Sequence, residues 1–245
     1  MTMTDTRSPH ALRRPLVITG LGLVALLVLT AIGFLTLRGQ IRDFDYTTTV
    51  SAGSDVRITG DNANVNLRPS ADGRVHVHAH AHGQYRRSQP QVSGRQVPNG
   101  AVIDESCDGS GPFELCDISV DVDLPPDNTV SVTGTNGSLT AQSLTGNLSL
   151  TTTNGDIRAS GIRSATLSAT SDNGAESLSF ATSPIKVNAR TTNGGITVTV
   201  PNGTSYDVHP TTTNGRITLS VPNGDSPDHV ITAITENGSI TVRGT

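Results

Sequence analysis

The sequence predicts an all-β protein, a β-solenoid of the parallel β-helix type preceded by one transmembrane helix. Three observations lead to this prediction. A charge-free apolar run lies near the N-terminus, a motif of about 20 residues recurs over the C-terminal half, and each copy alternates apolar and polar residues. We expect about six turns of 18–23 residues, preceded by less regular β turns.

The apolar run covers residues 16–37 and reads LVITGLGLVALLVLTAIGFLTL, 22 positions without a charge. As a helix it would be about 33 Å long, enough to cross a hydrocarbon core of about 30 Å. A cleaved signal peptide is the alternative, although the run is longer than a typical signal-peptide core and no clear cleavage site follows it. The chain therefore divides into a cytoplasmic tail (1–15), a transmembrane helix (16–37), a linker (38–46) and a β domain (47–245).

The charge of the remaining chain predicts its location. From Asp43 onward there are 12 Lys and Arg residues against 20 Asp and Glu residues, and no second apolar run. The basic residues on the two sides of the span are only mildly asymmetric, so the character of the large domain decides the orientation. We expect a single-pass plasma-membrane protein with a cytoplasmic N-terminus and an extracytoplasmic β domain. An acidic domain without basic clusters also argues against nucleic acid as a partner.

An internal repeat dominates residues 117–245. Residues 191–203 (TTNGGITVTVPNG) and 212–224 (TTNGRITLSVPNG) are identical at ten of thirteen positions. Asn-Gly pairs recur at spacings of 18, 19, 20, 21 and 23 residues, and the residues after each pair alternate as in a half-buried strand. The predicted repeat corners are Asn136, Gly137, Asn154, Gly155, Asn173, Gly174, Asn193, Gly194, Asn214, Gly215, Asn237 and Gly238.

Two architectures fit two short strands per repeat. Antiparallel hairpins joined by Asn-Gly turns would form a meander or barrel. We favour a solenoid, because stacked turns place equivalent residues in ladders about 4.8 Å apart, where identical neighbours are an advantage. Asn amides and Thr hydroxyls would then form hydrogen-bonded columns, with glycine supplying a positive φ at each corner. The last turn, at 241–245, would leave a strand edge open for self-association.

The region before the repeats contains a histidine-rich strand. Residues 55–67 and 74–81 alternate, and 84–100 is expected to be an irregular loop. On a strand, His76, His78, His80 and His82 would share one face, with successive residues about 6.6–6.8 Å apart. Neighbouring imidazoles could bind Zn²⁺ or Cu²⁺. The alternative is a solvent-facing side opposite a Val/Ala core side, since a straight strand does not converge four ligands on one ion. Below about pH 6.5 the cluster would gain charge.

Cys107 and Cys116 are the two cysteines of the chain, in SCDGSGPFELC. In an oxidising compartment a pair that closes a short loop favours a structural disulfide. A metal pair and a redox pair are the alternatives. A metal site normally needs four ligands, and redox pairs usually have the closer C-x-x-C spacing.

Residues 118–161 (ISVDVDLPPDNTVSVTGTNGSLTAQSLTGNLSLTTTNGDIRASG) resemble the bacterial putative-adhesin family of repeat domains. Members of that family share a V-x-V-x-x-P stretch followed by V-x-V-x-T-x-N-G-D-I-x-V, and the resemblance extends from about Val50 to the C-terminus. It implies a β-solenoid-like fold, often behind one membrane span. The family pattern contains no catalytic residues that could be carried over to this chain.

The sequence predicts a binding protein rather than an enzyme, with no cofactor. Its acidic residues are scattered and there is no G-x-S-x-G or H-E-x-x-H motif. We expect a membrane-tethered, adhesin-like or scaffold module whose partner is a cell-wall glycan or an envelope protein. The alternative is a sensor or accessory component of an envelope-stress system. A carbohydrate-active β-helix enzyme ranks third, because it would need clustered carboxylates. Exposed Thr and Asn also suit β faces and corners without any ligand.

Overall fold

The computed structural model describes residues 28, 40–85, 90–106, 115–222, 224 and 228–245. The predicted transmembrane helix at 16–37 lies outside this part apart from Val28. No helix within the described residues is long and apolar enough to span a membrane. The strands are β1 (Gln40–Ser51), β2 (Asp55–Pro69), β3 (Arg74–Tyr85), β4 (Gln91–Val97), β5 (Gly100–Ser106), β6 (Leu115–Leu124), β7 (Thr129–Asn136), β8 (Leu139–Gln142), β9 (Leu148–Asn154), β10 (Ile157–Ile162), β11 (Thr166–Asn173), β12 (Glu176–Phe180), β13 (Lys186–Asn193), β14 (Ile196–Val200), β15 (Asp207–Asn214), β16 (Ile217–Ser220), β17 (Val230–Asn237) and β18 (Ile240–Gly244).

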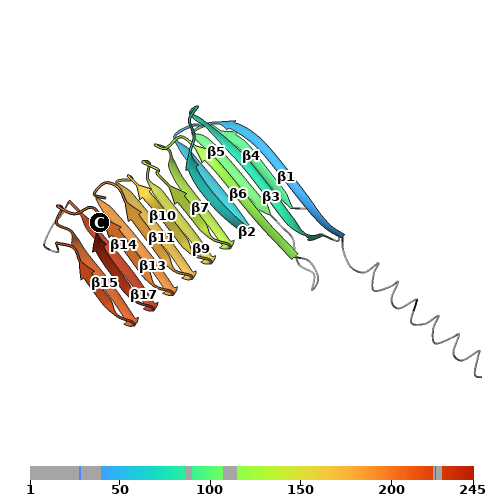
Figure 1. Ribbon diagram of the computed structural model, residues 1–245. Helices are drawn as coiled ribbons and strands as arrows, with labels where there is room; N and C mark the ends of the chain where they lie inside the picture. The colour runs from blue at the N-terminus through green and yellow to red at the C-terminus, as the bar shows by residue number, and fades with distance from the viewer. Residues whose placement is uncertain (1–27, 29–39, 86–89, 107–114, 223, 225–227) are drawn as a thin grey trace, which may run out of the picture. The chain divides into compact units, whose positions relative to one another are not determined.

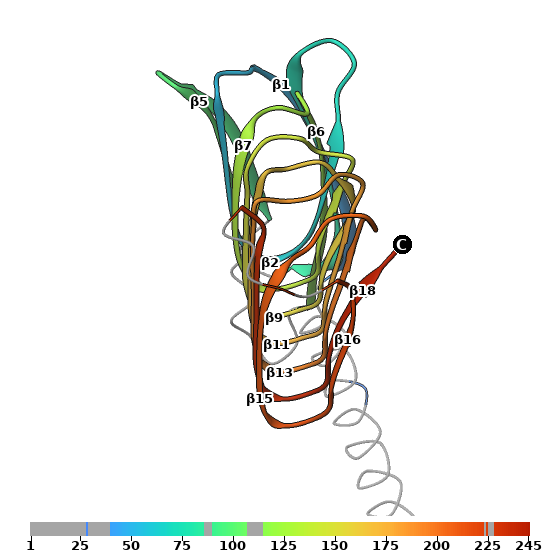
Figure 2. The ribbon, with the colours of Figure 1, turned by 90° about the vertical axis from the view of Figure 1, so that its left-hand side faces the viewer.

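From β7 onward the chain forms a parallel β-solenoid, which confirms the all-β, solenoid part of the predicted fold class. Each coil contributes one strand to each of two facing sheets, as Figure 2 shows from the end of the stack. Sheet A contains the ladder β8–β10–β12–β14, and sheet B contains β7–β9–β11–β13. All of these pairings are parallel. Successive coils keep the register of the repeat, so that Asn136 pairs with Asn154, Asn154 with Asn173 and Asn173 with Asn193.

The core is a thin layer of aliphatic side chains between the two sheets. Every second residue points inward, as in β14, where Ile196, Val198 and Val200 are buried and the two threonines between them are not. Equivalent inward residues stack into columns. One column of sheet A contains Ile157, Glu176, Ile196 and Ile240. Such columns bury apolar area in every coil, which is the main driving force for stacking.

The corner glycines are required by close packing rather than by a positive φ. Among them only Gly137 has a positive φ, of 130°. A Cβ added to Gly155, Gly174 or Gly194 would lie 1.9–2.0 Å from the carbonyl oxygen of the corner glycine one coil earlier. The expectation of a positive φ at each corner is therefore wrong. Neighbouring coils approach so closely at these corners that no side chain fits between them.

The first coil is not at the end of the stack. Residues 55–60 of β2 pair with both β5 and β7 in sheet B, and residues 63–69 pair with β6 in sheet A, where β8 lies on the other side. The β2 coil therefore lies between the β5–β6 and β7–β8 coils. Beyond it, β3 pairs antiparallel with β6, β4 pairs antiparallel with β5, and β1 pairs with β3. Figure 1 shows these strands at one end of the stack.

The last coil is also inserted. β13 pairs with β17, and β17 pairs with β15; in the other sheet β14 pairs with β18, and β18 pairs with β16. The β17–β18 coil thus lies between the β13–β14 coil and the β15–β16 coil, as Figure 1 shows. The prediction that residues 241–245 form the open edge is wrong, because β18 has a partner strand on each side and the outermost described coil is that of β15 and β16.

Pro210 gives a physical reason for this order. Asp207 donates its backbone N–H to the carbonyl of His229, which precedes β17. Successive N–H groups of a strand point to opposite sides, so the nitrogen of residue 210 faces away from β17. Proline has no N–H to donate there and is tolerated only at an edge. If another strand paired with the outer edge of β15, its carbonyl oxygen opposite Pro210 would have no N–H to accept from.

Two further expectations differ from the structure. Residues 40–46, assigned to the linker, belong to β1, and the expected loop at 84–100 contains β4. The disulfide prediction lies outside the described residues, because Cys107 and the side chain of Cys116 are not among them. It remains a prediction.

Candidate functional site: three polar surfaces of the solenoid

The first surface is the histidine face, formed by His76, His78, His80 and His82 on β3. The alternating valines and alanines of β3 are at most 3% exposed, so the imidazoles lie on the outer side of sheet A. The structure thus places all four predicted histidines on one face. β6 borders them on one side, with Asp123 opposite His76 and Asp121 opposite His78.

On its other side the histidine face contacts β1. The Nδ1 atoms of His82 and His80 lie 2.6 Å and 2.8 Å from carboxylate oxygens of Asp43 and Asp45. His78 and His76 contact the hydroxyls of Thr47 and Thr49 at 3.4 Å and 3.2 Å. These pairs run in opposite directions along the two strands, so β1 and β3 are antiparallel. His76 also contacts Asp72 through Nε2 at 2.9 Å.

The histidine face therefore has an acidic border on both sides and individual partners for each imidazole. In the described part of the chain, no group of three or more His, Cys, Asp or Glu side chains is arranged to hold a metal ion. Each imidazole instead faces a neighbour on β1 or in the turn before β3. Metal binding by His76, His78, His80 and His82 remains a prediction.

The His–Asp pairs alter proton affinities at this surface. The hydrogen bond to Asp45 raises the pKa of His80 above its usual 6.5. The hydrogen bond to His82 lowers the pKa of Asp43 below 3.8, and the hydrogen bond to His76 does the same to the pKa of Asp72. The raised pKa of His80 contributes stability below about pH 6.5 that is lost as the pH rises through its folded-state pKa. The lowered pKa values of the two aspartates contribute stability above pH 3.8 that is lost on further acidification.

We therefore expect β1 to be held most firmly between about pH 4 and pH 6.5. Backbone amides of β1 should exchange with solvent deuterium more slowly at pH 5.5 than at pH 8, after correction for the intrinsic rate. Asp45→Asn removes the charge that faces His80 and should abolish most of the difference. Thr47→Ser keeps the contact to His78 and serves as the control. Equal protection of β1 at both pH values would contradict the expectation.

The second surface is the asparagine ladder along one corner of the stack. From Asn136 onward, each side-chain amide donates to the amide oxygen of the asparagine before it in the stack, at 2.8–2.9 Å. In stacking order, its described members are Asn62, Asn136, Asn154, Asn173, Asn193, Asn237 and Asn214. The ladder confirms the predicted columns of Asn amides and adds Asn62, which lacks a following glycine and was missed for that reason.

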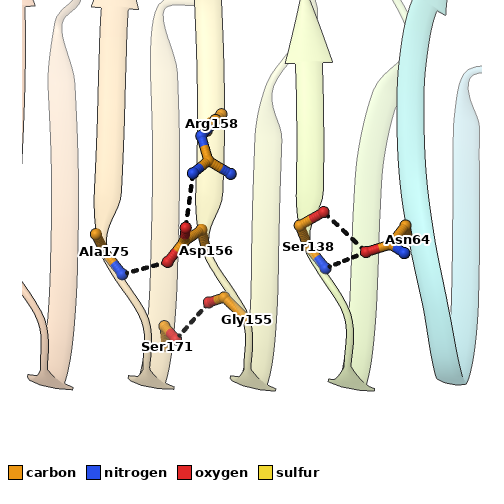
Figure 3. Close-up of polar contacts among 7 residues, drawn as sticks. All are labelled: Asn64, Ser138, Gly155, Asp156, Arg158, Ser171 and Ala175. Carbon is orange, nitrogen blue, oxygen red and sulfur yellow. Dashed lines mark hydrogen bonds and ion pairs between the residues drawn. The ribbon is translucent and has the colours of Figure 1, made fainter.

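Side chains near the corner add further contacts, most of them between coils (Figure 3). The Asn64 carboxamide oxygen accepts hydrogen bonds from the Ser138 amide and hydroxyl at 2.9 Å. Asp156 accepts from the Ala175 amide at 2.8 Å and pairs with Arg158 at 2.7 Å. The Ser171 hydroxyl donates to the Gly155 carbonyl at 2.9 Å. These bonds make the corner rigid and satisfy backbone groups that the turn leaves without strand partners.

The third surface is the outer side of sheet B, where small polar residues form rows across the strands. Ser131, Ser149 and Ser168 are paired in one row, and Thr133, Thr151 and Thr170 in the next. We call these two rows the Ser/Thr rows. Their hydroxyls repeat at the strand spacing of about 4.8 Å. Among the described residues, the first charged neighbour along these rows toward the C-terminal coils is Arg190, which pairs with Thr170.

Comparison with known proteins agrees with this architecture. Residues 110–243 match the model of the Toastrack DUF4097 family, which is more than half of the chain. The chain belongs to the Toastrack DUF4097 family. None of the curated proteins matches it.

Similar structures occur among the solved proteins. A putative cell adhesion protein from Clostridium sporogenes superposes with a TM-score of 0.50 at 10% identity, covering 84% of this chain and 100% of that one. A putative adhesin from Bacteroides fragilis has a TM-score of 0.49 at 14% identity, covering 83% and 97%. At such identities the likeness concerns the fold alone. The family match over residues 110–243 confirms the resemblance to a family of bacterial repeat domains inferred from residues 118–161.

The Toastrack core also contains two carboxylates that the sequence analysis missed. Glu176 is 1% exposed, and neither of its carboxylate oxygens has a hydrogen-bond partner. Burial raises its pKa to about 7; the amides of Arg190 and Ser171 oppose this rise without reaching hydrogen-bond geometry. A signal was present in the sequence, because Glu176 stands where neighbouring repeats have Ile157 and Ile196.

Glu105 is also buried, but one of its carboxylate oxygens accepts hydrogen bonds. It is 5% exposed, and its Oε2 accepts hydrogen bonds from the amides of Asp61 and Asn62 at 2.9 Å and 3.4 Å. Burial raises the pKa of Glu105, and the two amides oppose the rise. A Cβ on the adjacent Gly60 would lie 2.9 Å from the same oxygen. Glu105 thus links the corner of the β2 coil to the β5–β6 coil.

Proposed function

We propose that this Toastrack protein is a non-catalytic, membrane-tethered binding module whose solenoid lies outside the plasma membrane and contacts a cell-wall glycan or an envelope protein. Residues 16–37 provide the tether, and the solenoid provides the contact surface. The observation that supports this most is the pair of Ser/Thr rows on the outer side of sheet B. They form a repeating, uncharged array of hydroxyls on a rigid sheet.

Such an array suits a repeating polar polymer. Hydroxyls at a constant spacing can donate hydrogen bonds to successive sugar or peptide groups and accept them from these groups. Because the stacked coils already hold the hydroxyls in place, binding does not cost conformational entropy to order them. The printed names of the similar structures, a cell adhesion protein and an adhesin, are compatible with this role. An envelope protein that docks on this face would use the same hydroxyl hydrogen bonds.

Binding to isolated cell-wall fragments tests the proposal. We expect the full-length protein in detergent micelles to co-sediment with isolated bacterial cell-wall fragments. Thr151→Lys, in the centre of the Ser/Thr rows, should lower retention at least about tenfold, equivalent to about 1.4 kcal/mol. Ser177→Lys also introduces a lysine, but on the outer side of sheet A, and the variant should bind the fragments as the unaltered protein does. Equal retention of both variants, or none of the unaltered protein, would count against the proposal.

A second candidate function is that of a sensor or accessory component of an envelope-stress system. The position of the histidine face favours it, since His80 and His82 contact β1, the strand that follows the predicted span most closely. A change in protonation would then alter the attachment of the strand next to the tether. A reporter of envelope stress in cells carrying Asp45→Asn should lose its response to external acidification while the protein remains at normal abundance. An unchanged response would remove this candidate.

A further inference from the structure

The coil formed by β15 and β16 ends the described stack and leaves apolar side chains uncovered. Ile217 and Leu219 are 41% and 36% exposed, whereas Ile240 and Val242, their neighbours in the same inward columns, are buried completely. In contrast, the strands β6, β2, β8, β10, β12, β14 and β18 of sheet A each have a partner strand on both sides. The columns of the core therefore stop at β16 with two large side chains facing outward along the stack.

The backbone of β16 is open at the same place. Ile240 donates its N–H to the carbonyl of Arg216, so residues 216, 218 and 220 face β18. The N–H and C=O groups of Ile217 and Leu219 consequently face the free edge. β15 differs, because Pro210 removes one edge donor and Tyr206 exchanges backbone hydrogen bonds with Pro222 and Gly224. Of the two strands in this coil, β16 is the one that can accept another strand.

The opposite end of the solenoid cannot supply that strand in a parallel stack. There β4 and β3 cover the outer coil in antiparallel orientation, and the Tyr46 hydroxyl of β1 accepts a hydrogen bond from the Gly94 amide of β4 at 3.2 Å. The two ends of the molecule are therefore not complementary as successive coils are. The β16 end of one copy therefore pairs with the β16 end of a second copy. Such a pair is isologous and closed, so it does not extend into a fibre.

We propose that two copies pair through β16, antiparallel and around a two-fold axis at Thr218. Inward residues must meet inward residues, so Ile217 lies opposite Leu219 of the other copy and Thr218 lies opposite itself. Ile217 and Leu219 then form hydrogen-bonded pairs through the groups that face the free edge. Thr218 is the non-hydrogen-bonded pair on the outer face, where opposing Cα atoms lie about 4.5 Å apart. No charged side chain lies on β16 to oppose the contact.

Cysteine cross-linking tests this register. Opposing positions at the axis fall within the Cα separation that a disulfide needs, about 4.4–6.8 Å. Thr218→Cys should therefore form an intermolecular disulfide on mild oxidation of the full-length protein in detergent micelles. Peptide mass spectrometry would identify the 218–218 link and separate it from links of Cys107 and Cys116. Ser220→Cys is the matched control, because its two copies would be about 13 Å apart and cannot be bridged.

A second substitution tests the apolar contact. Leu219→Arg, introduced with Thr218→Cys, should reduce the cross-link at least about tenfold, since it places a charge opposite Ile217 of the other copy and brings two like charges into the interface. Ile185→Arg changes another exposed apolar residue, 56% exposed and before β13, and should leave the cross-link unaltered. Unchanged circular dichroism and thermal midpoint would show that both variants fold. No cross-link at 218, equal cross-links at 218 and 220, or a cross-link that survives Leu219→Arg would overturn the proposal.

Discussion

Replacing Glu176 with isoleucine should stabilise the protein by about 3 kcal/mol at pH 8. A pKa raised from 4.5 to about 7 means that folding keeps an ionised carboxylate in the core at a cost of about 3 kcal/mol. Neither carboxylate oxygen has a hydrogen-bond partner, so the substitution removes no native bond. The new side chain would continue the column of Ile157 and Ile196. Chemical denaturation of both proteins at pH 8 measures the gain.

The gain should depend on pH in a defined direction. The folded-state pKa of Glu176 lies above its usual 4.5, so the protonated carboxyl gives its full contribution to stability below pH 4.5. That contribution is lost as the pH rises through about 7. The difference between Glu176→Ile and the unaltered protein should therefore shrink from pH 8 to pH 5. A difference that stays constant over this range would show that ionisation is not the cause.

A polar substitution separates charge from packing at this position. Glu176→Gln removes the charge but keeps an unpaired polar group, so it should abolish the pH dependence and stabilise less than isoleucine. Glu105→Leu is the contrasting change at the other buried carboxylate. It should destabilise the protein, because the amides of Asp61 and Asn62 would lose their acceptor. Stabilisation by Glu105→Leu would contradict this distinction between the two glutamates.

The predictable part of the fold is the part with local repetition. Asn-Gly pairs in register place Asn154 beside Asn136 and Asn173, and the alternation after each pair decides which side chains point inward. Both follow from spacing alone. The histidine face was found in the same way, because its residues are two positions apart on one strand. Its acidic partners on β1 were not found, since Asp43 and Asp45 lie 35 to 39 residues away in sequence.

The order of the coils could not be obtained from the repeat, because stacking energies are nearly equal for similar neighbours. Both inserted coils bring together strands that are distant in sequence, as Asn62 with Asn136 and Asn193 with Asn237. Pro210 was the available signal at the C-terminal end, since a proline inside a strand favours an edge. The β2 coil has no comparable residue, and its insertion was not foreseeable from the pattern.

The corner glycines permit the sharpest test of the stack itself. Gly194→Ala should destabilise the protein by at least about 4 kcal/mol or prevent folding, because a Cβ there would lie 2.0 Å from the Gly174 carbonyl oxygen. Both atoms belong to backbone that adjoining coils hold in register, so neither can move without breaking neighbouring hydrogen bonds. The midpoint of urea denaturation, followed by circular dichroism, measures the loss.

The adjacent glycine provides the matched control. Gly195 stands where other coils have Ser138, Asp156 and Ala175, and the one atom that its Cβ would approach within 4 Å is the Ser239 carbonyl oxygen, at 3.3 Å. Gly195→Ala should therefore change stability by less than about 1 kcal/mol, with the small contact offset by lower entropy of the unfolded chain. Similar losses from both substitutions would mean that helical or strand propensity, and not the close approach of coils, requires glycine at these corners. A loss confined to Gly194 would show that the repeated Asn-Gly pair exists to let one coil lie directly on the next.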